Sequence, residues 1–137
     1  MAGSGDIVAG DVTCNGDFSA LLKGSGDIDV KGQIRAKSVS LTLQGSGDLN
    51  VVGVTGSEIS AMLQGSGDLK VRSAYTTSTV TAKLSGSGDM DVLGIRANNV
   101  AAQLAGSGDM TLSGSTRDAT LVLSRSGELN ARKLDAE

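Results

Sequence analysis

Apolar and polar residues alternate along most of the chain, and the alternation is tied to a repeated four-residue motif, GSGD. Counting back from each later motif, the second, fourth and sixth residues are apolar, and so are the first and third residues after its Asp. The second residue before the motif is always leucine. These leucines, the expected core ladder, are Leu22, Leu43, Leu63, Leu84, Leu104 and Leu123. A period of two predicts a short strand on each side of the motif.

The motif begins at Gly3 and recurs every 19 to 21 residues, ending in a degenerate copy, RSGE, at Arg125. A second turn, marked in most repeats by a glycine such as Gly32 or Gly53, absorbs the length variation. Two short strands and two turns in about 20–21 residues match one coil of a solenoid, whose equivalent apolar residues stack into interior ladders. Hairpin meanders, propellers and leucine-rich repeats fit this pattern less well. The sequence predicts an all-β, single-stranded parallel β-helix (β-solenoid) that forms one domain, residues 1–137.

The glycines of the motif are expected to form tight turns at one edge of every coil. Glycine adopts positive φ without steric cost, and Asp and Ser side chains accept hydrogen bonds from nearby backbone N–H groups in turns. These structural turn glycines are Gly3, Gly5, Gly24, Gly26, Gly45, Gly47, Gly65, Gly67, Gly86, Gly88, Gly106 and Gly108.

Stacked coils would place the aspartates of the motif in one column, where neighbouring carboxylates about 5 Å apart repel by about 1 kcal/mol in water. These residues are Asp6, Asp27, Asp48, Asp68, Asp89 and Asp109. Two interpretations stay open: turn N–H groups offset the repulsion, or the column binds cations such as Ca²⁺, as Gly- and Asp-rich β-rolls do. The nonapeptide repeat of those β-rolls is absent. These aspartates are the metal candidates, and no other cofactor is expected.

The two ends of the chain differ. Residues 125–137 form a degenerate repeat crowded with charges such as Arg132 and Lys133, which predicts a C-terminal capping coil that blocks pairing at the sheet edge. The N-terminus instead leads almost directly into a complete motif at Gly3. An uncapped solenoid end exposes unpaired backbone groups. We therefore expect a homo-oligomer formed through the N-terminal coil, by an N-to-N two-fold contact or by head-to-tail stacking.

The charge balance is mild, with 12 basic and 15 acidic residues. The basic residues form no run that could neutralise a row of phosphates, so nucleic acid is not an expected partner. No apolar stretch approaches the roughly 18 to 20 residues that cross a bilayer, so membrane insertion is not expected. The N-terminal residues do not lead us to expect a signal peptide, so the compartment is not predicted. The one cysteine, Cys14, excludes an intrachain disulfide.

Units of the form GSGDI-x-V-x-G, followed by V-x-L-x-L-x-GSGD, resemble the bacterial head GIN domain family of autotransporter adhesin-like proteins over essentially the whole chain. The resemblance implies a right-handed parallel β-helix, found in exported or cell-surface proteins, with no established molecular activity. It leaves a cell-surface or carbohydrate ligand open.

The preferred hypothesis is a non-catalytic structural or adhesive module that self-associates. A polysaccharide-active enzyme would need outward carboxylate pairs such as Asp27/Asp29 and Asp89/Asp91 as acid and base, yet histidine and sugar-stacking aromatic residues are missing. Binding to ice or another surface is suggested by an outward column of mostly hydroxyl residues. This column comprises Ser19, Ser40, Ser60, Thr81, Ala101 and Thr120.

Overall fold

The computed structural model describes residues 2–124 and 126–136, which form twelve β-strands and no helix. The strands are β1 (Ala2–Gly3), β2 (Ile7–Ala9), β3 (Val12–Thr13), β4 (Asp17–Gly24), β5 (Ile28–Arg35), β6 (Ser38–Gly45), β7 (Leu49–Gly65), β8 (Leu69–Val71), β9 (Ala74–Gly86), β10 (Met90–Leu104), β11 (Asp109–Leu123) and β12 (Glu128–Ala136). The all-β class expected from the alternating pattern is confirmed.

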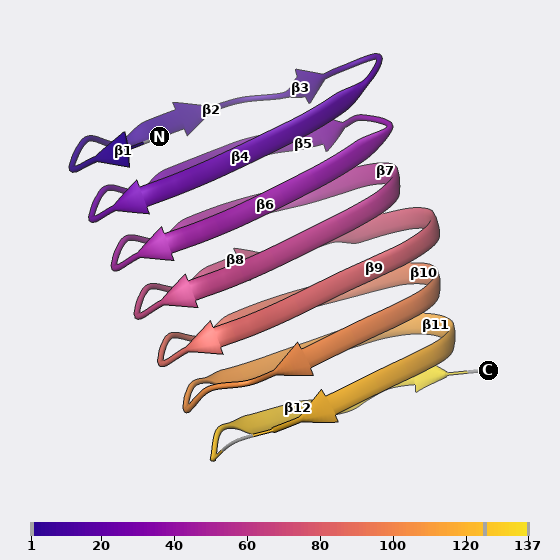
Figure 1. Cartoon of the computed structure of the whole chain (residues 1–137). Coiled ribbons are helices and arrows are strands. Elements are labelled where there is room, and N and C mark those ends of the chain that lie inside the picture. Colours follow the sequence, from indigo (N-terminus) through magenta and orange to yellow (C-terminus); the bar gives the residue numbers. More distant parts are fainter. Residues whose placement is uncertain (1, 125, 137) are drawn as a thin grey trace.

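Every pair of strands is parallel and joins segments about one repeat apart, as in the pairing of Ser19 with Ser40 and of Ser40 with Ser60. Figure 1 shows a continuous stack of coils that descends from the N-terminus to the C-terminus. The near strands, such as β4 and β6, run from right to left, and the chain returns on the far side as it descends. This winding is right-handed, and the predicted parallel β-solenoid is confirmed.

The coils contain a third strand segment that the apolar pattern did not predict. β5 continues past the second turn to Arg35, and β7 runs without a break from Leu49 to Gly65. The pairing register shifts between Val30 and Gln33, where the coil is one residue longer than the next. Backbone pairing therefore persists around the bend. The segment adds an inward column made of Val12, Ile34, Val54, Ala74 and Ile95.

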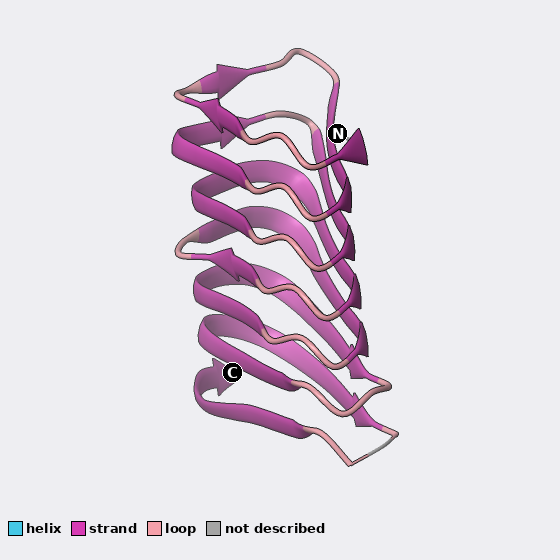
Figure 2. Cartoon of the chain, turned by 90° about the vertical axis from the view of Figure 1, so that its left-hand side faces the viewer, coloured by secondary structure: helices cyan, strands magenta, loops and turns pink. Residues whose placement is uncertain are grey.

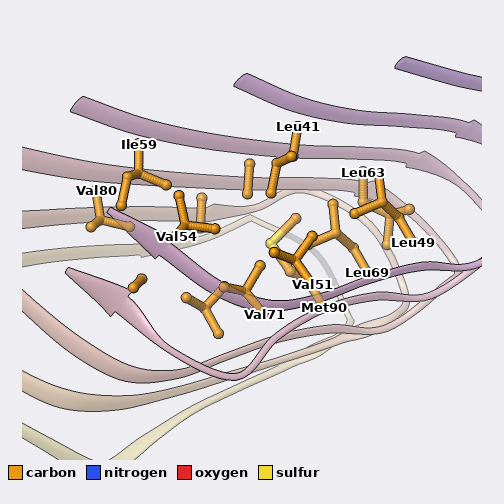
Figure 3. Packing of buried hydrophobic residues seen from close by; sticks show 14 of the residues in the cluster. Leu41, Leu49, Val51, Val54, Ile59, Leu63, Leu69, Val71, Val80 and Met90 are labelled. Carbon is orange, nitrogen blue, oxygen red and sulfur yellow. The ribbon is translucent and has the colours of Figure 1, made fainter. Parts of the chain in front are cut away.

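The core consists of aliphatic columns that run the length of the stack. Figure 3 shows side chains from the two sheet faces, such as Leu41 and Val51, directed into one shared interior. The leucines from Leu22 to Leu104 at the second position before the motif are at most 1% exposed. The chain has only two aromatic residues, so close packing depends on Leu, Ile, Val, Ala and Met side chains that each stack on their equivalents.

The last complete coil is paired along only part of its edge. β12 pairs with residues 109–116 of β11, and no described strand pairs with the far side of residues 118–123. Leu121 and Leu123 continue inward columns, yet they are 41% and 51% exposed. The apolar interior is thus open at this corner of the described chain.

The expected capping coil, residues 125–137, coincides largely with β12. Its first and last residues lie outside the described part of the chain, and the side chains of residues 132–136 are not described. Capping by these charged side chains stays a prediction.

Candidate functional site

The GSGD turns form one continuous edge of the stack, where the connecting loops lie one above another (Figure 2). The carbonyl of the first glycine of a motif accepts two hydrogen bonds from the turn of the next coil. Gly24 O accepts them from Ser46 N at 3.0 Å and from Gly47 N at 3.3 Å. The same pair of bonds recurs at the next three motifs. The turns are therefore bonded along the axis, as the strands are.

The second glycine of the motif is required by the close approach of the neighbouring coil. A Cβ atom at Gly47 would lie 1.8 Å from Gly26 O, and the three following motifs give 1.8 to 1.9 Å. Positive φ occurs among the described motif glycines only at the first position, in Gly24, Gly45 and Gly65. The expectation of positive φ was wrong at the second glycine and also at Gly86 and Gly106. The second glycine instead leaves space for a carbonyl of the neighbouring coil.

Each aspartate of the motif accepts a hydrogen bond from the backbone of the next coil. Asp48 N–H donates to Asp27 Oδ1 at 2.9 Å, and Asp68 N–H donates to Asp48 Oδ1 at 3.2 Å. Bonds of 3.1 to 3.3 Å likewise join Asp27 to Asp6, Asp89 to Asp68, Asp109 to Asp89 and Glu128 to Asp109. A hydrogen bond to a carboxylate is stronger than a neutral one, so this aspartate ladder favours the structural interpretation of the column.

The same column offers few of the oxygen ligands that a bound cation would need. Within the described ranges, no group of three or more His, Cys, Asp or Glu side chains is arranged to hold a metal ion. The ladder bonds engage one oxygen of each carboxylate, whereas Ca²⁺ takes about six to eight oxygen ligands. Calcium binding along the column stays a prediction.

In the carboxylate pairs considered for acid–base catalysis, the first aspartate belongs to the aspartate ladder, and in the first pair the second aspartate lines a separate hollow. Asp27 and Asp89 belong to the aspartate ladder and accept backbone N–H groups. Asp29 lines a surface hollow together with Lys31 and Lys70, and Asp27 is not part of that lining. The described geometry therefore does not direct the two carboxylates of the first pair into one hollow.

The outward face of β4, β6, β7, β9, β10 and β11 carries the hydroxyl column. Its members pair in register: Ser19, Ser40, Ser60, Thr81, Ala101 and Thr120. A hollow of about 530 Å³ lies over the first four members, and its lining includes Asp17 and Glu58. Ala101 interrupts the hydroxyl groups in the fifth coil.

A basic surface that was not predicted from the sequence lies over β5, β7 and β8. Two hollows of about 520 and 330 Å³ share Lys31 and Val52 in their linings. Arg35 lines the larger hollow, while Lys70 and Arg72 line the smaller one. The basic residues are scattered along the chain but gather in space. Aligning the repeats could have predicted this surface, since Lys31 and Arg72 occupy the same position in their repeats, directly after the second inward residue of the strand.

Two buried threonines, also missed by the apolar pattern, occupy the corner where the chain turns onto the second face. Thr76 donates its hydroxyl hydrogen bond to Ser57 O. Thr116 Oγ1 lies 3.1 Å from Asn98 O and 2.9 Å from Asp118 O. These bonds satisfy hydroxyl groups that would be costly to bury without a partner. We therefore assign both threonines a structural role.

None of the described residues belongs to a helix with the length and apolar character needed to cross a membrane.

The chain matches the family described as "Putative auto-transporter adhesin, head GIN domain" over residues 19–112 and again over residues 60–137. The two matches begin 41 residues apart, which is also the separation between Gly24 and Gly65, two coils of the stack. No curated protein and no solved structure matches the chain. Since the two matches together span residues 19–137, the chain belongs to this family of head GIN domains.

Proposed function

We propose that the chain is a non-catalytic structural or adhesive module, exported to the cell surface, that self-associates through its N-terminal coil. The family description supports the adhesive role and the surface location. A non-catalytic role is supported by the surroundings of the carboxylates. Those in the aspartate ladder bind backbone N–H groups, and Asp29 lies in a hollow with lysines.

Self-association rests on the exposure of the first member of one apolar column. Ile7 is 42% exposed, whereas Ile28 and Leu49, the next members, are 4% and 0% exposed. Full burial of such a side chain stabilises by about 1.5–3 kcal/mol. β2 pairs with β5 on one side only in the described chain, so its other edge offers backbone groups to a partner strand.

Sedimentation velocity tests this contact. We expect the wild-type chain to form a dimer or a larger assembly and Ile7→Asp to sediment as a 13.7 kDa monomer, because burying an unpaired carboxylate is costly. Val52→Asp is the matched control, since Val52 is 40% exposed in the middle of the stack and gains the same charge.

Circular dichroism would establish that both variants keep their β structure. A monomeric wild-type chain, or an equal loss of assembly in the two variants, would exclude association through the N-terminal coil.

A second candidate function is favoured by the hydroxyl column, which is uninterrupted over four successive coils. Hydroxyl groups repeated about every 5 Å along an axis suit an ordered surface such as ice. A thermal-hysteresis assay tests this candidate, and the complete absence of hysteresis would exclude it.

A further inference from the structure

The two hollows of the basic surface lie side by side and share Lys31 and Val52; together they are here called the axial groove, defined by Lys31, Arg35, Val52, Lys70 and Arg72. Lys31, Val52 and Arg72 each directly follow one of three valines that are paired in register. They therefore occupy three successive coils, and the groove follows the solenoid axis.

The axial groove has an excess of positive charge that no neighbour neutralises by contact. The side chains of its four cations are exposed and form no hydrogen bond or ion pair with any residue in the described ranges. Two carboxylates, Asp11 and Asp29, line the same hollows, and Asp11 Oδ1 already accepts a bond from Gln33 N–H at 2.9 Å. The chain as a whole has a net charge of −3, so this face differs in sign from the rest.

The spacing of the cations suits a polymer. Neighbouring coils lie about 4.8 Å apart, so Lys31 and Arg72, two coils apart, present positive charges about 10 Å apart along the axis. This is close to the length of one disaccharide unit in an extended polysaccharide. A polymer laid along the groove would therefore meet these two cations about one disaccharide length apart.

Uncharged and acidic groups in the groove fit the hydroxyl groups of sugars. Thr13, Gln33 and Asn50 line the hollows beside the two aspartates, and all of these can hydrogen-bond a hydroxyl group. Nucleic acid fits less well. The linings include no aromatic side chain on which bases could stack, while the two aspartates would oppose any polyanion.

We propose that the axial groove binds a linear acidic polysaccharide, a polymer bearing carboxylate or sulfate groups, laid along the stack. The inference rests on the adhesive part of the proposed function and does not require self-association. Cations supply the attraction, and the hydrogen-bonding groups distinguish a sugar polymer from other polyanions.

The test compares the full wild-type chain with a groove variant in direct binding measurements. The groove variant carries Lys31→Gln, Lys70→Gln and Arg72→Gln. The probes are polygalacturonate, which carries carboxylates, dextran sulfate, and uncharged dextran. At about 50 mM salt we expect the wild-type chain to bind at least one polyanion and not to bind dextran. The affinity of the groove variant for that polyanion should be at least about tenfold lower, because charge contacts are lost.

The control variant removes the same charge elsewhere on the surface. It carries Lys23→Gln, Lys83→Gln and Arg117→Gln, all at exposed positions outside the groove. Its affinity should stay within about twofold of wild type, because contacts rather than net charge govern binding. Preference between polygalacturonate and dextran sulfate identifies which acidic group is recognised.

Three results would overturn the proposal: no polyanion binding by the wild-type chain, an equal loss of affinity in both variants, or equally tight binding of single-stranded DNA. Sedimentation of the groove variant keeps the two proposals separate. If the groove variant loses polysaccharide binding but still assembles, the effect is on the axial groove alone. If Ile7→Asp loses assembly but still binds polysaccharide, the effect is on the N-terminal contact alone.

Discussion

At the residue scale, the GSGD motif is explained by contacts between coils. Its first glycine offers a carbonyl to two N–H groups of the next turn, and its second glycine leaves room for a carbonyl of the preceding turn. Its aspartate accepts the backbone N–H of the following aspartate. A different residue in one coil would therefore disturb the neighbouring coils as well as its own turn.

Gly47→Ala should destabilise the stack by about 3 kcal/mol, because the added methyl group would lie 1.8 Å from Gly26 O and the coils would have to separate. Urea denaturation measures the change. Gly16→Ala is the matched control, since a Cβ atom there has no other atom within 4 Å. Equal midpoints for the two variants would contradict the close approach of the turns.

At the element scale, the strands beside the motif were predictable and the segment after the second turn was not. The predicted strands keep a fixed spacing from GSGD, so alternation identifies their inward residues. The register shift after Val30 removes that fixed spacing for Ile34 and its equivalents. Buried Thr76 and Thr116 further weaken the apolar pattern, because their hydroxyl groups are satisfied by carbonyls that only the fold brings near.

Substitutions in one leucine column should reveal which coils are covered. Leu63→Ala is expected to cost about 2–5 kcal/mol, since Leu63 is fully buried between coils. Leu123→Ala, at 51% exposure in the same column, should cost under about 1 kcal/mol, because less apolar surface leaves water there. Chemical denaturation measures both. A similar cost for the two changes would show that the C-terminal edge is covered in solution.

At the scale of the whole molecule, the stack makes surfaces from residues far apart in sequence. Lys31 and Arg72 lie 41 positions apart, yet they line one groove because two successive registers align their strands. The repeat period predicted the solenoid and its columns. It did not predict the axial groove, since the residues of the groove vary from coil to coil and follow no repeated motif.

The central claim is that the coils stack in register, because the aspartate ladder, the core columns and the axial groove all depend on it. Electron–electron distances between two spin labels on one chain measure this stacking directly. The native cysteine is removed by Cys14→Ser, and the labelled chain is diluted with unlabelled chain so that distances between chains are not detected. Labels at Ser19→Cys and Thr120→Cys, five coils apart in one outward column, should give backbone separations of about 24 Å. Moving the first label to Ser40→Cys should shorten the distance by one coil, about 5 Å. An unchanged or longer distance would contradict the in-register stack.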